Sequence, residues 1–202
     1  MLVRIAALIA FLFSATSYAS NHESALTGLQ GATVAIIEAV TEDREKLDAD
    51  RELLYSTVRG IVDPHFDFQR MSRLALGKWW RKASDGEKVE FERLFSDLIV
   101  RTYSTAVLNY TDQDIKWKLG NADPKGKVKV SVVIVDSNGV PIDVVFFLAK
   151  SKRYHGFRVY DVHIEGISIV LTYRSSFNEV ARNRKVSGVI RSLQEKSDSA
   201  SK

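Results

Sequence analysis

Apolar residues recur at helical spacing through the first half of the chain. Positions three or four residues apart predict helices over residues 26–40, 54–62, 68–77 and 84–106. The second helix ends at Asp63-Pro64, because the residue before a proline avoids helical angles. Gly77 is a suitable C-terminal cap for the third. The fourth begins with a capping-box pair, Ser84 and Glu87, and keeps one apolar face for about five turns.

After the fourth helix the pattern changes to that of strands. Alternating or continuous apolar runs predict strands over residues 127–135, 140–149 and 157–165. Residues 136–139 have the composition of a hairpin turn between the first two. Gly166 interrupts the chain before a short apolar strand, short helices follow around Phe177 and Ile190, and residues 195–202 are expected to be a flexible tail. Helices first and an antiparallel sheet later predict an α+β fold.

The second predicted strand is apolar on both of its faces. One face carries Ile142, Val144, Phe146 and Leu148, and the other carries Val145, Phe147 and Ala149. A strand of this kind must be covered on both sides or must border a cavity.

The 202 residues are enough for one domain with a sizeable core, which we expect over residues 20–194. Residues 1–19 are typical of a secretory signal peptide, in which Arg4 precedes an apolar run and small residues allow cleavage after about Ala19. The apolar run is too short to span a bilayer. The absence of cysteine excludes a disulfide framework and a lipoprotein anchor. We therefore expect an exported, periplasmic protein.

Charge is unevenly distributed between the two halves of the chain. Residues 20–115 carry 12 Lys and Arg against 17 Asp and Glu, whereas residues 116–202 carry 16 against 8. The basic half is either a solvated surface or a rim for anionic lipid headgroups or an acidic docking partner. Nucleic acid is not an expected partner, since the basic residues form no dense run.

Residues suited to catalysis or metal binding are scattered along the chain. The four histidines have no partner at metal-ligand spacing, so we expect neither a metal site nor a cofactor. Residues 166–170 begin like a nucleophile elbow but lack its second glycine. Asp161, His163 and Glu165 alternate on one strand face, and either form an acid/base set or are charged residues facing solvent. A non-covalent enzyme is therefore the alternative to a protein without catalytic activity.

Three segments carry motifs that are weak alone and more specific in their common order. They are VDPHFDF at residues 62–68, LGKWWR at residues 76–81 and FRVYDVHIEGISIVLTYRSSF at residues 157–177. These segments resemble the Pro-x-x-Asp-Phe, Leu-Gly-x-x-Trp-Arg and Glu-Gly-Ile/Val-Ser…Tyr-Arg elements of the MlaC/toluene-tolerance family of periplasmic phospholipid-binding proteins. Phe157 departs from the pattern, because many relatives carry tryptophan there.

This resemblance implies a fold and a function. The fold would be NTF2/cystatin-like, with N-terminal helices cupped over a curved antiparallel sheet, short C-terminal helices and an apolar cavity between the layers. The function would be to shuttle phospholipid between an outer-membrane lipoprotein–porin complex and an inner-membrane complex of an MCE-domain protein and an ABC transporter, which maintains outer-membrane lipid asymmetry. A carrier of another lipid, such as a hopanoid, an NTF2-like enzyme and a structural adaptor are the alternatives.

Apolar periodicity also selects candidate residues for the cavity wall, between the long helix and the sheet. They are Phe95, Leu98, Tyr103, Val132, Ile134, Val144, Phe146, Leu148, Val162, Ile164, Ile169 and Phe177. Four of these, Phe95, Leu98, Tyr103 and Phe177, also match the family pattern. Tyr173 and Arg174 are candidate headgroup contacts, although Arg174 is equally suited to holding the closing helix in place. A β-bulge would send the opposite set of strand residues inward.

Overall fold

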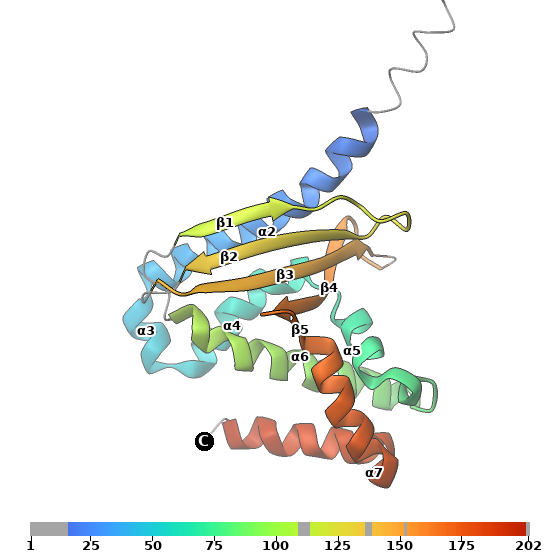
Figure 1. The fold of residues 1–202 in the computed structure, drawn as a ribbon. Coiled ribbons are helices and arrows are strands. Elements are labelled where there is room, and N and C mark those ends of the chain that lie inside the picture. The colour runs from blue at the N-terminus through green and yellow to red at the C-terminus, as the bar shows by residue number, and fades with distance from the viewer. Residues whose placement is uncertain (1–15, 109–113, 136–138, 152, 201–202) are drawn as a thin grey trace, which may run out of the picture.

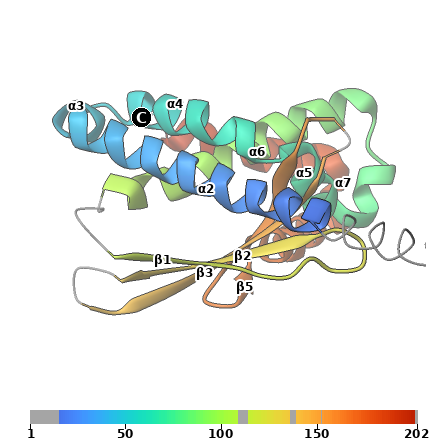
Figure 2. The same ribbon diagram turned by 90° about the horizontal axis from the view of Figure 1, so that it is seen from above.

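The computed structural model describes residues 16–108, 114–135, 139–151 and 153–200. These residues form two layers, in which helices cover one face of a five-stranded antiparallel sheet (Figures 1 and 2). The sheet is curved and does not close into a barrel. The predicted α+β fold is thereby confirmed. Most of the predicted signal peptide, residues 1–15, and most of the predicted hairpin turn, residues 136–138, lie outside the described residues.

The helical layer is built mainly from the first half of the chain. Labelled as in Figure 1, its elements are α2 (Thr16–Glu42), α3 (Arg44–Ala49), α4 (Arg51–Val62), the 3₁₀ turn η1 (Asp63–His65), α5 (Phe68–Leu76), the 3₁₀ turn η2 (Gly77–Arg81), α6 (Asp85–Leu108) and α7 (Ile169–Ala200). The four helices predicted from periodicity correspond to α2, α4, α5 and α6. The Asp-Pro pair does end α4, since the chain there continues as η1.

Side chains close to the helix ends account for where α5 and α6 begin and end. Asp67 accepts a hydrogen bond from the backbone N–H of Arg70 at 3.0 Å and so caps α5. The backbone N–H of Ser84 donates to Glu87 at 2.8 Å, and the N–H of Glu87 donates to the Ser84 hydroxyl at 3.2 Å, as the capping box predicts. Gly77 ends α5 with φ of 58°, which only glycine adopts without strain.

The sheet has the strand order β1-β2-β3-β4-β5, so each strand pairs with its neighbours in sequence. The strands are β1 (Ile115–Leu119), β2 (Val128–Val135), β3 (Pro141–Lys150), β4 (Phe157–Ile164) and β5 (Ile167–Ser168). Periodicity did not predict β1, because five alternating residues are a short signal. Phe147 pairs with Asp161 and Leu148 with Val159, so Tyr160 is an extra residue, a β-bulge in β4.

The two faces of the sheet differ in what covers them. The sheet packs mainly against α2, α5 and the start of α7, whereas α6 is flanked by α4, α5 and α7 (Figure 2). Val145 and Phe147 lie on the opposite face and are half-buried there. The Lys129 ammonium lies 5.2 Å from the Phe147 ring centre, and the His163 ring lies 4.2 Å away. Neighbouring side chains therefore partly cover the second apolar face of β3.

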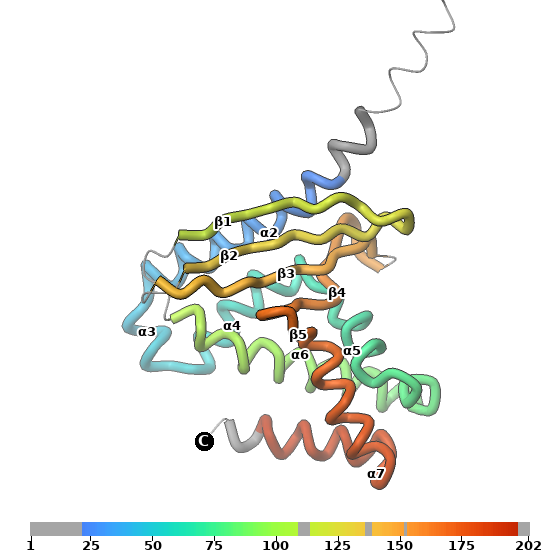
Figure 3. The backbone as a smooth tube through the Cα atoms, viewed as in Figure 1, coloured from blue at the N-terminus to red at the C-terminus, as the bar shows by residue number. Residues whose placement is uncertain are grey.

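The last helix, α7, is bent at Lys185, where φ is 56° and ψ is −167° (Figure 3). The bend produces two helical segments, as the two short helices predicted around Phe177 and Ile190 require. The second segment runs along α6 on the side away from the sheet (Figure 1). A Cβ at Gly188 would lie 2.2 Å from the Cβ of Arg184, so only glycine fits behind the bend. Helix α7 includes residues 195–200, and the flexibility expected for that tail stays a prediction.

Candidate functional site

The candidate wall residues of the sheet all lie on its helix-facing side. They are Val132, Ile134, Val144, Phe146, Leu148, Val162 and Ile164. Each packs against the hydrophobic core or belongs to it, whereas Val145 and Phe147, between them in β3, do not. The bulge at Tyr160 changes the alternation only before Asp161 and leaves Val162 and Ile164 facing the helices. The alternation of β2 and β3 is thus sufficient to identify the inner face of the sheet.

Burial on this inner face changes along the strands. At one end Val128, Val130, Leu148 and Val159 are fully or almost fully buried. Towards the other end the inward side chains are only half-buried, although they are large and apolar. We call this set the inner band, and it consists of Ile115, Ile134, Val144, Phe146 and Ile164. The described part of the chain therefore covers the inner face completely at one end and incompletely at the other.

The inner band draws residues from four strands through the register of the sheet. Ile115 pairs with Ile134, which lies opposite Ile142. Val144 pairs with Ile164 across β3 and β4. Cross-strand neighbours on one face lie about 5 Å apart, so the band is continuous. Ile115 was missed by the sequence analysis, and the alternation Ile-Lys-Trp-Lys-Leu of residues 115–119 was the signal that could have identified it.

The helical side of the same core contributes two further half-buried residues, Tyr103 and Val107, one turn apart on α6. Burial raises the pKa of the Tyr103 phenol, and the nearby Tyr173 phenol raises it further. Tyr103 therefore stays protonated at neutral pH and can donate a hydrogen bond. Among the candidate wall residues, Tyr103 is the one with a polar side chain, and its phenol interacts with that of Tyr173 in α7.

An aromatic cluster joins α6 to the first segment of α7. Ring centres of Phe95 and Phe177 lie 5.5 Å apart, those of Phe95 and Tyr173 5.3 Å apart, and those of Phe91 and Phe177 5.3 Å apart, all edge to face. Phe95 is fully buried and Phe177 nearly so. These rings fill the space between two helices, so Phe95 and Phe177 support the core beneath the inner band. Ile169 is buried at the start of α7.

Leu98 lies on a different side of α6 from the expected cavity wall, whereas Arg174 lies where the structural one of its two expected roles would place it. Leu98 lines a cleft of about 180 Å³ with Leu193, on the side of α6 that faces the second segment of α7. An apolar stripe on a helix does not reveal which of two neighbours it faces. Arg174 is exposed and lies against Gly77, where an added Cβ would come within 2.8 Å of its Nε. Its position favours the structural role, which is to hold η2 against α7.

The residues of the possible acid/base set are engaged in structural hydrogen bonds. The Ser168 hydroxyl donates to Asp161 Oδ2 at 2.7 Å, and the backbone N–H of Val170 donates to Asp161 Oδ1 at 3.2 Å. His163 Nε2 lies 3.2 Å from Asp161 Oδ2. Glu165 accepts a hydrogen bond from the backbone of β3 and does not join them. Asp161 thus joins β4 to the first turn of α7.

The described residues contain no group of three or more His, Asp or Glu placed to hold a metal ion. None of the helices in the described ranges is long and apolar enough to cross a bilayer. The candidate site is the apolar surface between the sheet and the helices, with the phenols of Tyr103 and Tyr173 near it.

Comparison with known proteins adds independent findings. The family model described as "MlaC protein" matches residues 30–195. The intermembrane phospholipid transport system binding protein MlaC of Haemophilus influenzae is 26% identical over 168 residues, which are 81% of this chain and 76% of that protein. The toluene tolerance protein ttg2D of Pseudomonas putida is 23% identical over 150 residues, 74% of this chain and 69% of that protein.

A solved structure is also similar along nearly its whole length. It is the phospholipid-binding protein from Ralstonia solanacearum in complex with a phospholipid, at a TM-score of 0.78 and 25% identity, covering 87% of this chain and 98% of that one. The two-layer arrangement of helices on an antiparallel sheet is therefore a fold that has been observed with a phospholipid bound.

Proposed function

The chain belongs to the MlaC protein family, whose model covers residues 30–195, and we propose that it is a phospholipid carrier. A relative named as a phospholipid transport binding protein and a structural neighbour holding a phospholipid support this function. The acyl chains lie between the inner band of the sheet and the helical layer. The headgroup stays at the edge of this acyl-chain site, where water remains available to the phosphate.

The observation that carries the proposal is the incomplete burial of the inner band. Large apolar side chains such as Phe146 and Ile164 face the helices and yet remain half-buried. In an ordinary core such inward side chains are close-packed, because empty space beside them forfeits dispersion contacts. Acyl chains would supply the missing contacts and remove the same surface from water.

The energetics of extraction require an apolar site of this kind. Each buried CH₂ contributes about 0.8 kcal/mol, so two acyl chains of some 16 carbons represent on the order of 25 kcal/mol. A carrier can take such a lipid from a bilayer only if its interior is nearly as apolar as the bilayer itself. Transfer is then close to isoenergetic, and the carrier needs no nucleotide. The phosphate stays outside because an unpaired buried charge is costly.

The candidate residues divide into two groups under this proposal. Val132, Ile134, Val144, Phe146, Leu148, Val162 and Ile164 form the sheet wall, and Tyr103 forms part of the helical wall. Phe95, Ile169 and Phe177 support that wall from behind. Under the same proposal Tyr103 and Tyr173, whose phenols lie near each other, donate hydrogen bonds to an ester or phosphate oxygen of the lipid.

We further propose that the protein is exported, is cleaved after about Ala19 and works in the periplasm. There it would exchange lipid with an outer-membrane lipoprotein–porin complex and with an inner-membrane complex of an MCE-domain protein and an ABC transporter. The resemblance of its motifs to the family supports these partners. Intact-mass analysis of the periplasmic fraction tests the first step, because a mature chain beginning at Ser20 is expected and a full-length chain contradicts it.

Native mass spectrometry of the chain from residue 20, purified without detergent, tests the carrier function directly. We expect one phospholipid for each protein molecule, identified after organic extraction. A hopanoid or another lipid in place of the phospholipid would support the carrier function and change the identity of the bound lipid. A folded protein that is empty and that takes no lipid from vesicles would refute the proposal.

A further inference from the structure

A cluster of basic side chains surrounds a cavity at the end of the sheet where the inner face is fully covered, next to Val128 and Leu148 in the strands. The cavity has a volume of about 290 Å³. Ala149 and Phe157, both buried, are part of its lining. Gly126 completes its lining, and the remaining lining side chains, which we call the basic cleft, are His22, Arg70, Lys125, Lys127 and Lys150. They come from α2, α5, the segment before β2, and β3.

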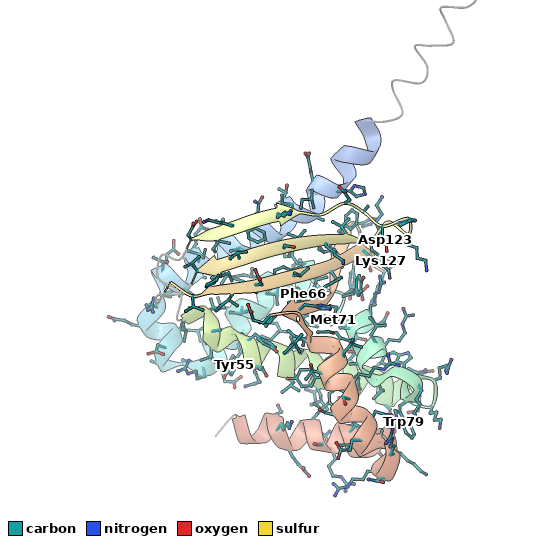
Figure 4. The ribbon with its side chains drawn as sticks, in the orientation of Figure 1. Tyr55, Phe66, Met71, Trp79, Asp123 and Lys127 are labelled. Atoms are coloured by element: carbon teal, nitrogen blue, oxygen red, sulfur yellow. The ribbon has the colours of Figure 1, made fainter. Side chains whose placement is uncertain are left out.

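The basic cleft lies around the start of β2 and the end of β3, whereas the inner band begins at Phe146 and continues towards the other end of these strands. Lys127 immediately precedes β2, whereas Ile134 is near its end. Ile134 is seven positions from Lys127, which corresponds to about 23 Å, whereas Phe146 of the inner band is four positions from Lys150 of the cleft, about 13 Å. Figure 4 shows Lys127 and Asp123 together at the corner of the sheet beyond the start of β2. Val128 and Leu148, a cross-strand pair that is fully or almost fully buried, lie between the basic cleft and the inner band, so close-packed side chains separate a ligand in the basic cleft from a lipid held at the inner band.

Aromatic rings hold several of these cations in place. The Arg70 guanidinium lies 4.0 Å from the ring centre of Tyr160, and the Lys127 ammonium lies 5.7 Å from the same centre. The Lys150 ammonium lies 6.0 Å from the ring centre of Phe157. Cation–π contacts at these distances orient a charged group without neutralising it. The β-bulge turns Tyr160 out of the inner face, and its ring can therefore contact both Arg70 and Lys127.

The cluster carries more positive charge than its surroundings compensate. Within the described ranges, Arg70, Lys125, Lys127 and Lys150 form no ion pair with a carboxylate. Asp123 offsets part of this charge, because one of its oxygens accepts the backbone N–H groups of Lys125 and Lys127, at 2.8 Å and 2.9 Å. These hydrogen bonds and the charges of both lysines lower the pKa of Asp123, but a single carboxylate still leaves the four cations in excess. Like charges gathered in a concave site concentrate a positive potential and attract anions.

We propose that the basic cleft is a second binding site, specific for a phosphate group. A phosphate dianion matches a planar guanidinium that can donate two parallel hydrogen bonds, together with ammonium groups that act as point charges. Arg70 is the principal ligand and Lys127 the second, because both are half-buried and fixed by Tyr160. The phosphate belongs either to a soluble molecule or to a lipid headgroup at a membrane surface.

Calorimetric titration with inorganic phosphate at low ionic strength tests the site in the mature chain. We expect saturable binding of one phosphate in both the delipidated and the lipid-loaded protein. Arg70→Gln should weaken binding about tenfold, the value of one charge-assisted hydrogen bond, and Lys127→Gln should weaken it several-fold. Lys118→Gln, which removes an exposed lysine outside the cavity, is the matched control and should leave binding unchanged.

Three results would overturn the proposal. The first is the absence of saturable binding. The second is a loss of phosphate affinity in Lys118→Gln equal to that in the two test variants, which would indicate a general electrostatic attraction and no specific site. The third is loss of phosphate binding in the lipid-loaded protein alone, which would place the phosphate in the carrier's own headgroup position. Urea midpoints of both test variants confirm that they fold. The third result leaves the carrier function intact, so the two proposals fail separately.

Vesicles then identify the source of the phosphate. With saturable binding established, the protein is floated with phosphatidylcholine vesicles that contain or lack phosphatidic acid. Retention that depends on phosphatidic acid and falls in Arg70→Gln, but not in Lys118→Gln, supports a site for lipid phosphate at a membrane surface. Retention that is equal in all three proteins supports a site for a soluble phosphate.

Discussion

Asp161 is expected to stabilise the fold and to have no catalytic role. Its carboxylate accepts hydrogen bonds from the Ser168 hydroxyl at 2.7 Å and from the Val170 backbone N–H at 3.2 Å, and its side chain is 14% exposed. Ser168 is the last residue of β5, directly before α7, and Val170 lies in the first turn of α7. Removing the carboxylate should therefore detach the first turn of α7 from β4.

The magnitude follows from these contacts. A hydrogen bond to a charged group contributes about 1.5–3 kcal/mol, and a negative charge near a helix N-terminus adds about 0.3–1 kcal/mol. Ser168 can rehydrate in part, so we expect Asp161→Ala to lower the free energy of unfolding by about 2–4 kcal/mol. Asp161→Asn keeps an acceptor but loses the charge and should cost about half as much. His163→Ala should cost about 1 kcal/mol or less, because His163 is more exposed and makes a longer contact.

Urea unfolding followed by tryptophan fluorescence is a suitable assay, because the chain has three tryptophans. With a slope of about 2 kcal/mol per molar urea, Asp161→Ala should lower the midpoint by about 1–2 M. Lipid content per folded molecule should stay the same in all three variants. An unchanged midpoint in Asp161→Ala would refute the structural role. Equal loss of a measured turnover in Asp161→Ala and His163→Ala, with stability retained, would establish the acid/base alternative.

Three further predictions concern the inner band, the bend of α7 and the pH dependence of stability. Phe146→Trp should fill the acyl-chain site and reduce co-purified lipid to well under one molecule per protein, whereas Val145→Trp on the opposite face should not; equal lipid in both folded variants would contradict the wall assignment. Gly188→Ala should lower the free energy of unfolding by about 1–3 kcal/mol, because the added Cβ has no room. Gly60→Ala should raise it by about 0.5–1 kcal/mol, because no atom lies within 4 Å of the added Cβ and alanine favours the helix. Similar urea midpoints in the two variants would contradict the steric argument. Burial lowers the pKa of His65, so the unfolded chain binds the His65 proton more tightly and the free energy of unfolding should fall as the pH drops below 6.5. In His65→Asn, urea midpoints measured across this pH range should depend less steeply on pH. An unchanged pH dependence would contradict His65 as its origin.

Much of the local structure was predictable because it depends on residues a few positions apart. The capping box of Ser84 and Glu87 and the end of α4 before Pro64 involve neighbours in the chain, and both are confirmed. The alternation in β2 and β3 identified the inner face, since side chains on a strand point to opposite sides whatever the strand packs against. The order of helices before strands was sufficient for the fold class.

Several features of the site depended on distant contacts. Periodicity marked Leu98 as apolar and inward, but α6 has neighbours on more than one side, and packing placed Leu98 against the end of α7. Asp161 had the composition of a catalytic residue, and its role as an anchor for α7 depends on the position of Ser168 and Val170. Two short helices were predicted around Phe177 and Ile190, but the bend between them falls at Lys185, which is neither glycine nor proline, so no local signal indicated its position.

The sequence by itself determined which residues are apolar, which face of each element they share, and the weak motifs that resemble the MlaC family. These follow from backbone geometry and the chemistry of each side chain, both of which act locally. Only the tertiary structure decided where coverage of the sheet ends, so that Val128 is buried while Ile134 and Val144 are not, and which cations gather around Tyr160. The physical reason is that burial and electrostatic potential are sums over everything nearby in space, most of which lies far away along the chain.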